Sequence, residues 1–228
     1  MIYPRVCPLC GEILINNDRL SCGNCKLKIE YLKPPLCFKC GKEITDEEEE
    51  FCFDCKEKPK SFISGFPAMR YTDGVKKCVG DFKYKNKREY APFFARELIV
   101  ANGAKIADIK PDVLVPVPVH KVKLKKRGYN QAELLARELG KIIDVPVDND
   151  IIIRKNNTAP QKELSPIERE NNIKSSFIPS DKVVKYKCAL LVDDIYTTGV
   201  TIEACTKVLH KKGIEKVYYT SICIGEGI

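Results

Sequence analysis

From residue 65 onward, apolar and polar positions follow two patterns that alternate along the chain. Short runs dominated by apolar residues predict strands at residues 66–71, 113–119, 151–153, 189–192 and 216–224. Segments in which apolar residues recur every three or four positions predict helices at residues 73–84, 90–102, 131–142 and 200–212. Because strands and helices alternate, we expect an α/β domain with a mainly parallel sheet and helices on both of its faces.

Two segments interrupt this alternation. Pro116 and Pro118 lie within the apolar run at 113–119, and because proline cannot donate to a sheet ladder they indicate a strand end and a rigid loop. Residues 154–176 are polar and contain two further prolines. A loop of this length in a compact domain is typical either of a lid over a substrate or of a disordered segment, and the pattern leaves both open.

Residues 1–60 lack the alternation and are organised by cysteine instead. Eight of the twelve cysteines form four C-x-x-C pairs, at Cys7 and Cys10, Cys22 and Cys25, Cys37 and Cys40, and Cys52 and Cys55. The last two pairs repeat the first two after thirty residues, which indicates an internal duplication. We therefore predict a small N-terminal module at residues 1–60 and an α/β domain at residues 61–228.

Each copy of the repeat supplies four thiols, which suits a closed tetrahedral Zn²⁺ site, as in a zinc ribbon, with no open position for catalysis. We predict two structural zinc ions, each bound within one copy, although an interleaved arrangement uses the same cysteines and stays open at this stage. Gly11 and Gly41 follow the second cysteine of a pair, where a tight knuckle needs a residue without a Cβ. The metal is expected to supply the folding free energy of so small a module.

The chain begins without a charged and then apolar leader, and it contains no run of about 18 apolar residues. We therefore expect neither export nor membrane insertion, and we expect a cytoplasmic protein. In a reducing compartment, paired cysteines are typical of metal ligands rather than of disulfides.

The formal net charge of +8 is unevenly distributed. Residues 1–60 contain ten Lys and Arg against eleven Asp and Glu, whereas residues 61–228 contain 29 against 20. Zinc bound by four thiolates adds negative charge, so the N-terminal module alone is a poor ligand for a phosphate backbone. Any contact with nucleic acid is therefore predicted for the second domain.

Two basic segments of the second domain are candidates for that contact. In residues 76–90, cations interleave with aromatic rings on which bases can stack. The residues assigned to this contact are Lys83, Tyr84, Lys85, Lys87 and Arg88. The same pattern fits an amphipathic helix with Phe82 and Tyr90 turned inward, and both interpretations stay open. Residues 120–130 contain five Lys or Arg within seven positions and suit pyrophosphate, nucleic acid or both.

The most specific pattern is LLVDDIYTTGVT at residues 190–201. An apolar strand leads to two adjacent acids, Asp193 and Asp194, and then to a small, hydroxyl-rich turn before a helix. The helix N-terminus and the hydroxyls of Thr197 and Thr198 can hold a phosphate, and the two carboxylates suit sugar hydroxyls or a phosphate-bound Mg²⁺. The pattern predicts recognition of a phosphorylated sugar. The alternative is a buried strand that ends in two acids before a helix cap.

This segment resembles the motif by which type I phosphoribosyltransferases bind phosphoribosyl pyrophosphate (PRPP), namely apolar residues, two acids and a T-T-G turn. The resemblance implies PRPP and Mg²⁺ as ligands, with Asp193 and Asp194 at the ribose hydroxyls and the cation. It places the 5-phosphate at Thr197, Thr198, Gly199, Val200 and Thr201. VPVPVH at residues 115–120 resembles the pyrophosphate loop of these enzymes, which assigns pyrophosphate to Val117, Pro118 and Val119.

Arg127 is assigned to pyrophosphate as well, so that Asp193, Asp194 and Arg127 are the candidate catalytic residues. Purine-salvage members of the family carry an acid at the position of Thr197. The motif is more similar to the orotate type, which implies a pyrimidine-like acceptor rather than a purine. Nothing else in the sequence indicates which base is recognised.

The cysteine repeats, VPVPVH, RGYNQAELLA, TAPQKELSPIERENNIKSSF and LLVDDIYTTGVT together resemble the ComF family of bacterial late competence proteins over nearly the whole chain. Arg127, Gly128, Asn130 and Gln131 correspond to its R-G-x-N-Q, and Gln161, Leu164, Arg169 and Asn172 fall on its Q-x-x-L and R-x-x-N stretch. Asn130, Gln131, Gln161 and Arg169 are therefore candidate lid or substrate residues. The resemblance implies a role with single-stranded DNA (ssDNA) in natural transformation, and a competence helicase or another DNA-processing protein as partner.

Three functions stay open after the sequence has been considered. The first is a competence protein that couples a PRPP site to the uptake or handling of ssDNA. The second is an active phosphoribosyltransferase of nucleotide metabolism with a pyrimidine-like acceptor. The third is a PRPP-sensing adaptor whose acidic ribbons contact another protein. Whether transfer to an acceptor takes place is left open in all three.

Overall fold

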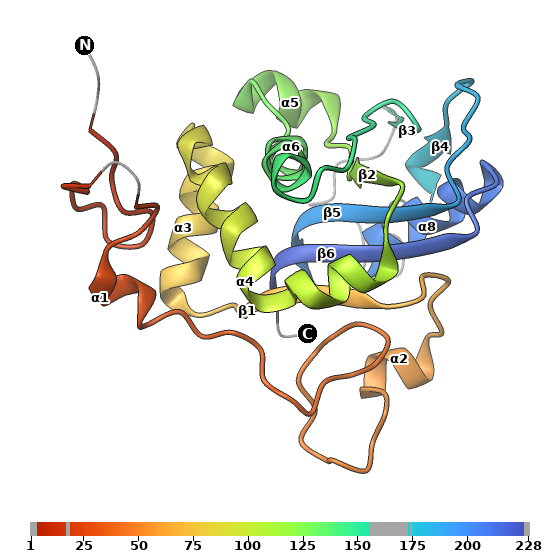
Figure 1. Cartoon of the computed structure of the whole chain (residues 1–228). Helices are drawn as coiled ribbons and strands as arrows, with labels where there is room; N and C mark the ends of the chain where they lie inside the picture. The colour runs from red at the N-terminus through yellow and green to blue at the C-terminus, as the bar shows by residue number, and fades with distance from the viewer. Residues whose placement is uncertain (1–3, 17–18, 156–172, 174, 226–228) are drawn as a thin grey trace, which may run out of the picture.

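The structure is a computed structural model that describes residues 4–16, 19–155, 173 and 175–225. A sheet crosses the centre of the molecule between layers of helices (Figure 1). The first cysteine-rich segment, with α1 (Gly23–Lys26), lies beside α3 (Asp73–Tyr84), and the second, with α2 (Phe53–Glu57), lies beside β1 (Gly65–Arg70). The predicted division between residues 60 and 61 stays a prediction. In the described part of the chain, no helix combines the length and the apolar character needed to cross a membrane.

Four parallel strands form the central sheet. They are β1, β2 (Val113–Pro116), β5 (Cys188–Tyr196) and β6 (Lys216–Ile224), in the order β1-β6-β5-β2. Most residues of β2, β5 and β6 are buried, because both faces of the sheet are covered, and the strands therefore appear in the sequence as apolar runs. The predicted α/β domain with a mainly parallel sheet is confirmed.

Helices cover the two faces of the sheet unequally. On one face lie α3, α4 (Ala91–Ile109) and α6 (Gln131–Ile143), with a short 3-10 turn, η1 (Arg88–Tyr90), before α4. On the other face lies α8 (Val200–Lys211). Alternate residues of β5 point to opposite sides, so that Leu190 packs with the three helices and Leu191 packs with α8. This alternation also decides where the two acids at the end of β5 can point.

Two predicted boundaries were wrong. The helix predicted to end at residue 102 continues to Ile109, because Asn102 is buried within it and donates from Nδ2 to the carbonyls of Phe66 and Pro67 at 3.2 and 3.1 Å. The strand predicted to end at residue 192 continues to Tyr196, because residues beyond 192 still pair with β6. Both errors have a tertiary cause that the local pattern does not contain.

The strand predicted at residues 151–153 is present as β3 (Ile152–Arg154), but two other elements were not predicted. The first is the strand β4 (Phe177–Pro179), which pairs antiparallel with β3 in a separate two-stranded sheet. The basic residues after β2 form the helix α5 (Lys121–Arg127), which His120 caps at its start and Gly128 ends in a left-handed conformation. The stretch 156–172, which was expected to be a lid or a disordered loop and contains Gln161 and Arg169, lies outside the described residues.

The segment between the two cysteine clusters runs along the outer edge of β1. The N–H of Leu32 donates to the carbonyl of Ala68, and the N–H of Arg70 donates to the carbonyl of Glu30. Tyr31 forms an antiparallel bridge with Met69, and its hydroxyl donates to the buried carboxylate of Glu97. The linker thus covers a sheet edge that would otherwise expose unpaired backbone groups.

Candidate functional site

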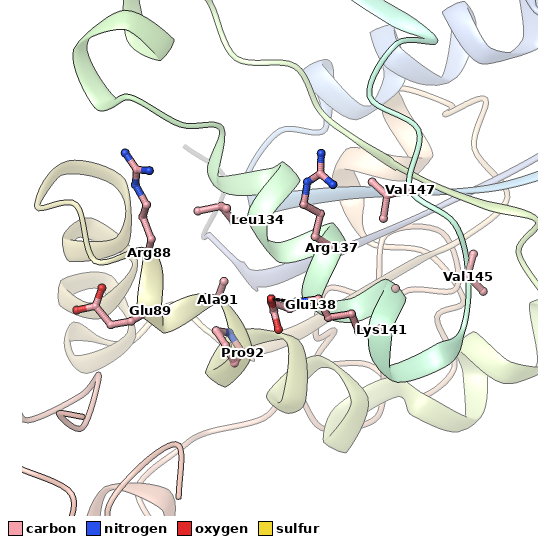
Figure 2. Close-up of a pocket in the computed structure, with 11 residues that line it drawn as sticks. Arg88, Glu89, Ala91, Pro92, Leu134, Arg137, Glu138, Lys141, Val145 and Val147 are labelled. Atoms are coloured by element: carbon pink, nitrogen blue, oxygen red, sulfur yellow. Dashed lines mark hydrogen bonds and ion pairs between the residues drawn. The ribbon is translucent and has the colours of Figure 1, made fainter. Parts of the chain in front are cut away.

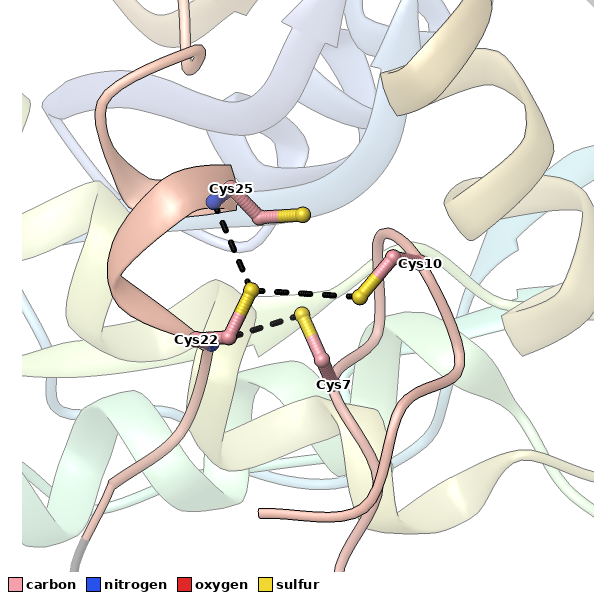
Figure 3. Close-up of side chains that lie close together, drawn as sticks. All are labelled: Cys7, Cys10, Cys22 and Cys25. Carbon is pink, nitrogen blue, oxygen red and sulfur yellow. Dashed lines mark hydrogen bonds between the residues drawn. The ribbon is translucent and has the colours of Figure 1, made fainter.

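The eight paired cysteines gather into two clusters, Cys7, Cys10, Cys22 and Cys25 in the first and Cys37, Cys40, Cys52 and Cys55 in the second. Within each cluster the ligand atoms lie within 4.8 Å of one another. Figure 3 shows the side chains of the first cluster turned toward a common centre. Each cluster comes from one copy of the repeat, so the predicted pairing within copies is confirmed and the interleaved alternative is wrong.

The chemistry of the clusters fits zinc. In the first cluster the N–H of Cys22 donates to Sγ of Cys7, and the N–H of Cys25 donates to Sγ of Cys22, both at 3.4 Å. Burial raises the pKa of the Cys7 thiol, but N–H donors from Cys22, Cys10 and Leu9 outweigh burial and bring that pKa to about 7. Donors aimed at sulfur favour the thiolate that Zn²⁺ requires. Two structural zinc ions therefore fit this chain, one in each cluster.

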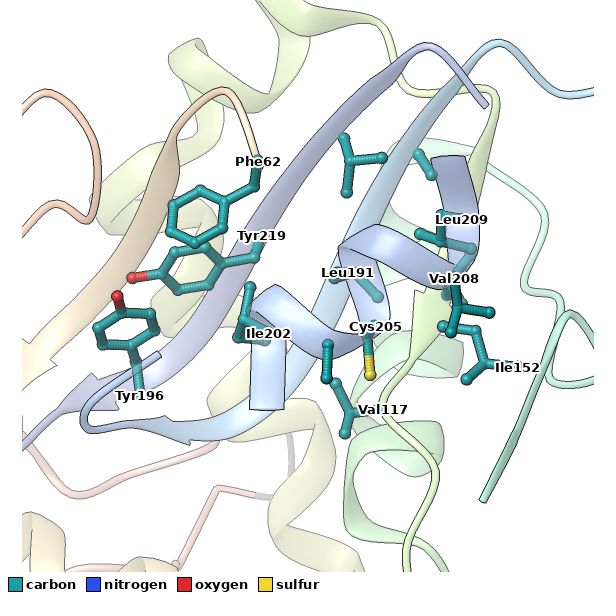
Figure 4. Packing of buried hydrophobic residues seen from close by; sticks show 14 of the residues in the cluster. Phe62, Val117, Ile152, Leu191, Tyr196, Ile202, Cys205, Val208, Leu209 and Tyr219 are labelled. Atoms are coloured by element: carbon teal, nitrogen blue, oxygen red, sulfur yellow. The ribbon is translucent and has the colours of Figure 1, made fainter. Parts of the chain in front are cut away.

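The second cluster belongs to the core of the α/β domain. Its four cysteines are buried and pack with Phe62 and Tyr219 on the α8 face of the sheet. The hydroxyl of Tyr219 donates to the carbonyl of Cys40 at 2.6 Å. The ring of Tyr219 stacks on the ring of Tyr196, with centroids 4.7 Å apart (Figure 4). Through Tyr219, the second cysteine cluster is thereby linked to Tyr196 at the end of β5.

Residues that follow the second cluster hold the start of α8. The N–H and the Oγ of Ser61 each donate to the carboxylate of Glu203 at 2.7 Å, and Nζ of Lys60 donates to the carbonyl of Thr198 at 3.4 Å. Glu203 lies in the first turn of α8, and Thr198 lies in the turn before it. The second ribbon is therefore attached directly to the turn predicted to bind the 5-phosphate.

The two acids at the end of β5 point to opposite faces of the sheet. Asp194 is buried on the side of α3 and α6, where its Oδ1 lies 2.9 Å from Nζ of Lys83 and its Oδ2 accepts from Nε2 of Gln131 at 2.7 Å. Asp193 is half-buried on the other side, and its Oδ1 accepts from the N–H of Asp194 at 2.8 Å. The acids are neighbours in sequence but have different partners.

Asp193 has an unusual electrostatic environment. Burial, and then the charge of Asp194, raises the pKa of Asp193 to about 7, against the attraction of Lys83 and Arg154. A carboxyl group of this kind gains most from an added cation, because a cation restores the stabilisation that burial removes. The position therefore suits a Mg²⁺ ion brought in with a phosphorylated ligand.

The turn between β5 and α8 presents its two threonines to solvent. Thr197 and Thr198 are exposed, and Gly199 precedes α8 with a φ of 75°. A Cβ at Gly199 would lie 2.2 Å from the hydroxyl oxygen of Tyr196, so glycine is required for space as well as for conformation. The first amides of α8 lack partners within the helix and face this turn, as helix geometry dictates.

The predicted pyrophosphate loop is only partly available for a ligand. The N–H of Val117 donates to the carbonyl of Val192 at 2.9 Å and continues the pairing of β2 with β5, so the assignment of this amide to pyrophosphate needs correction. Nδ2 of Asn130 donates to the carbonyl of Val117 at 3.1 Å. Pro118 and Val119 are half-buried, and Val119 remains the candidate donor of this loop.

The R-G-x-N-Q stretch positions the site from the side of α6. Oδ1 of Asn130 accepts from the N–H of Ala132 at 3.1 Å and caps the start of α6. Nη1 of Arg127 donates to Oε1 of Gln131 at 2.8 Å, and the same amide group donates to Asp194. Arg127 and Gln131 from one sequence motif and Asp194 from another therefore form one connected series.

Arg154 is a site residue that the sequence did not indicate. It ends β3, its Nη1 lies 3.4 Å from the carbonyl oxygen of Pro118, and its guanidinium lies 5.0 Å from the ring centroid of Phe177. Its Nε is buried and, within the described part of the chain, has no hydrogen-bond partner. No local pattern marks this arginine, because only the packing of β3 beside the loop after β2 brings it to the site.

The residues predicted to contact DNA do not form one surface. Lys83 is largely buried against Asp194, so it faces this acid rather than solvent. Lys85 pairs with Asp81 at 2.8 Å and Lys87 pairs with Glu89 at 3.3 Å on the exposed side. The guanidinium of Arg88 lies 4.7 Å from the ring centroid of the buried Tyr129, whereas the ring of Tyr84 is exposed. Their assignment to DNA stays a prediction.

Two hollows lie near these elements. The larger, of about 820 Å³, lies between the start of α4 and α6 and is lined by Arg88, Leu134 and Arg137 among others (Figure 2). It does not include the acids or the turn, so it is distinct from the candidate site. The smaller, of about 520 Å³, is lined by Thr197 of the turn, Tyr71 after β1 and Lys42 of the second ribbon.

Two known protein families match separate parts of the chain. Residues 1–56 match the double zinc ribbon domain, and residues 95–224 match the phosphoribosyl transferase domain. The match supports the fold and the two four-cysteine sites described above.

Curated relatives cover nearly the full length. Competence protein F of Haemophilus influenzae is 30% identical over 91% of this chain and 91% of its own length. DNA utilization protein YhgH of Escherichia coli K12 is 26% identical over 98% of both chains. Competence protein ComFC of Bacillus subtilis is 26% identical over 93% of this chain and 91% of its own. With a double zinc ribbon, a phosphoribosyl transferase domain and this similarity from end to end, the chain belongs to the ComF family of competence proteins.

Proposed function

We propose that the chain binds PRPP with Mg²⁺ at the end of β5 and acts in the cytoplasm in the uptake or handling of ssDNA during natural transformation. The observation that carries the proposal is the end of β5 itself. Asp193 and Asp194 point to opposite faces near the end of the strand, and the exposed Thr197 and Thr198 follow directly after Tyr196, with Gly199 at the start of α8. The competence and DNA utilization relatives support the biological context.

The turn is suited to the 5-phosphate of PRPP. The first amides of α8 point toward it, the helix dipole favours an anion there, and the hydroxyls of Thr197 and Thr198 are exposed beside it. The contacts of Ser61 with Glu203 hold the first turn of α8 in place. The phosphate would therefore bind to a preformed cradle rather than to a mobile chain.

The acids are suited to the ribose and its cation. Lys83 and Gln131 hold Asp194 in one orientation, while each of its oxygens keeps capacity for a further donor such as a ribose hydroxyl. Asp193 is more accessible and suits Mg²⁺ that arrives with the ligand. A bound Mg²⁺ would supply Lewis-acid stabilisation of the pyrophosphate.

The proposal assigns the departing pyrophosphate to a group of cations near the loop after β2 and α5. Burial, followed by the charges of Arg154, Arg127 and Lys83, lowers the pKa of Lys123, so these cations act on one another electrostatically. Cleavage of the anomeric C–O bond puts negative charge on pyrophosphate, and such a preorganised cluster would stabilise it. Whether cleavage leads to transfer depends on an acceptor, and the proposal assigns none.

Isothermal titration of PRPP tests the site. Wild-type protein should bind PRPP in the presence of Mg²⁺, and Asp193→Asn should lose about tenfold or more in affinity because a charge-assisted contact is removed. Asp108→Asn, an exposed acid on α4, is the matched control and should bind as wild type. Equal affinity for all three proteins would contradict the assignment of Asp193, and an absence of binding would contradict the proposal as a whole.

Anisotropy with a labelled oligothymidylate tests the second half of the proposal. The logarithm of the binding constant should fall linearly with the logarithm of the salt concentration, because phosphate contacts release counterions. Lys125→Gln together with Lys126→Gln, on the exposed side of α5, should reduce the slope by about one to two units. Binding that is insensitive to salt, or absent, would contradict a role in contact with ssDNA.

A second candidate is an active phosphoribosyltransferase with a pyrimidine-like acceptor. The hollow of about 520 Å³ beside Thr197, with the ring of Tyr71 in its wall, favours this candidate because it has the size of a small-ligand pocket. Pyrophosphate should then be released from PRPP only after one particular base is added. If no base among the natural pyrimidines produces release, this candidate is wrong.

A third candidate is a PRPP-sensing adaptor. The first ribbon exposes the apolar side chains of Ile13, Ile15 and Leu27, which favours a contact with another protein such as a competence helicase or another DNA-processing protein. In this case PRPP should bind without any release of pyrophosphate, and the partner should be captured through the first ribbon.

A further inference from the structure

The ring of Tyr84 is exposed at the end of α3, but one of its faces is covered. The side chain is 70% exposed, and the guanidinium carbon of Arg127, the last residue of α5, lies 4.7 Å from the ring centroid. A base could stack on the ring only where the guanidinium does not lie. The state of Arg127 therefore decides how much of the ring is available.

Arg127 is also connected to the candidate PRPP site. Its Nη1 donates to Gln131 at 2.8 Å, and Gln131 in turn donates to Asp194 at 2.7 Å. The same guanidinium thus contacts an exposed aromatic ring and a polar series that ends at the buried acid. A ligand at Asp194 and a ligand at Tyr84 would act on one side chain.

A second connection joins the same two places through the chain of α3. Lys83 precedes Tyr84 and lies 2.9 Å from Asp194. The contacts from Asp194 through Gln131 and Arg127 to Tyr84, and back through Lys83 to Asp194, form a closed ring. Movement of Arg127 breaks its contact with the Tyr84 side chain in this circuit of contacts, while the contact of Lys83 with Asp194 keeps the end of α3 in place.

We propose that the covered face of Tyr84 is a base-stacking site for ssDNA, and that Arg127 uncovers it when pyrophosphate draws its guanidinium toward Asp194. PRPP and ssDNA then bind cooperatively. The inference rests on the proposed function, because it takes PRPP as the ligand at the end of β5.

The direction of the movement follows from the strength of the two contacts. A guanidinium over an exposed ring is weakly held, because water screens the attraction. Pyrophosphate offers charge-assisted hydrogen bonds in the bidentate geometry that a guanidinium prefers. When PRPP is bound, Arg127 therefore moves from the ring to the pyrophosphate, and the ring gains a free face.

The surroundings of Tyr84 fit a nucleic-acid strand. Lys85 is exposed next to it in the chain, and Lys121, Lys125 and Lys126 are exposed on α5, the helix whose last residue covers the ring. Tyr129, which lies under the guanidinium of Arg88, is buried and donates its hydroxyl to the carbonyl of Phe82, which leaves it no face for a base. Exposed bases stack on such rings while cations contact the phosphates between them.

The test measures anisotropy of a labelled 20-nucleotide oligothymidylate with and without PRPP and Mg²⁺. In wild type, PRPP should tighten binding of the strand about fivefold or more, and the strand should tighten PRPP by the same factor, because coupling is reciprocal. An abasic strand of equal length keeps the phosphates without the bases and should show no gain. Free thymidine monophosphate should not compete at concentrations equal to those of the strand. Competition by the free nucleotide would overturn the assignment to a strand.

Variants separate the ring from the arginine. Tyr84→Leu keeps an apolar side chain but removes the ring, and it should lose the gain caused by PRPP. Phe53→Leu, an equally exposed ring on α2, is the matched control and should keep the gain. Arg127→Gln leaves the ring uncovered, so binding of the strand should no longer depend on PRPP. Circular dichroism of each variant verifies folding.

The outcomes distinguish this inference from the function on which it rests. If PRPP or the strand fails to bind wild type at all, the proposed function is wrong. If both bind but neither changes the affinity for the other, the inference is overturned and the proposed function stands. A gain that persists in Tyr84→Leu would likewise overturn the stacking site.

Discussion

The two zinc ribbons are copies of one sequence pattern with the same local geometry, yet they lie in different surroundings. Gly11 and Gly41 have φ angles of 83° and 71°, and the N–H of each donates to the backbone carbonyl of the first cysteine of its pair at 2.8 Å. A Cβ at Gly11 would have nothing within 4 Å, whereas a Cβ at Gly41 would lie 2.6 Å from Cδ of Pro67. The knuckle is the same in both ribbons, but only the second is packed against the sheet.

This difference shows that a metal site and its structural role are specified separately. Four cysteines at fixed spacing suffice to form either cluster, because ligand geometry is local. Burial of the second cluster depends on Tyr219 and Phe62, which belong to other parts of the chain. The second ribbon therefore shares a buried core with the α/β domain and contacts the turn before α8. The first packs partly against the core cluster on the α3 and α4 side and keeps an exposed apolar surface.

The largest expected difference between the ribbons concerns loss of a ligand. Cys40→Ser should remove one zinc ion and most of the roughly 5–15 kcal/mol by which a domain of this kind is stable, because its cluster lies in the core. Cys10→Ser, at the matching exposed position, should remove one zinc ion and leave the thermal midpoint of the α/β domain nearly unchanged. Metal analysis and circular dichroism would measure both, and equal destabilisation would contradict the comparison.

A smaller difference is expected for the knuckle glycines. Gly11→Ala should lower the free energy of unfolding by about 1–2 kcal/mol, because alanine is strained in the left-handed backbone conformation of this position. Gly41→Ala adds a clash with Pro67 and with the carbonyl of Gly65, so its total cost should be about 2–5 kcal/mol. Urea unfolding gives both values, and similar costs would show that the second knuckle can move away from β1.

The attachment of the second ribbon can be weakened by a single hydroxyl. Tyr219→Phe leaves the carbonyl of Cys40 without its donor, which should cost about 1–3 kcal/mol and weaken PRPP binding as the turn loosens. Tyr31→Phe is the control, because it removes a tyrosine hydroxyl that contacts Glu97 from the linker between the ribbons. It should reduce stability without changing the affinity for PRPP. Equal affinity for PRPP in both variants would show that the second ribbon does not influence the turn before α8.

The smallest effect is expected on the surface of the first ribbon. Ile15→Ser changes an exposed side chain and should alter stability by less than about 0.5 kcal/mol. The same change should reduce capture of a partner protein if the first ribbon is a contact surface. A melting scan measures the first quantity, and co-purification with a DNA-processing protein measures the second.

Much of the fold could be predicted because its elements have strong local patterns. The helix Asp73–Tyr84 and the strand Lys216–Ile224 have the predicted bounds, since one is amphipathic and the other is a continuous buried run. The pattern failed at Asn102, which is polar but satisfied by carbonyls from β1, and at β4, which is too short to be distinguished from a loop.

The candidate site could be predicted in part for a related reason. Asp193, Asp194 and the turn to Gly199 form one contiguous motif, so local chemistry identifies them. Lys83 was assigned to DNA and instead lies against Asp194, and Arg154 carried no signal at all. Both reach the site from distant segments, and charge patterns along a chain do not show which cations will face which acids.

The amino-acid sequence by itself determined the two four-cysteine sites, the alternation of strands and helices, and the strand, acids and turn that suit a phosphorylated sugar. Each depends on residues close together in the chain, where spacing alone sets the geometry. Only the tertiary structure decided that one cysteine cluster is fully buried and the other only in part, that the acids point to opposite faces, and that Arg127 connects Tyr84 with Asp194. Those outcomes depend on packing between distant segments, because burial and ion pairing are set by the neighbours that the fold brings together.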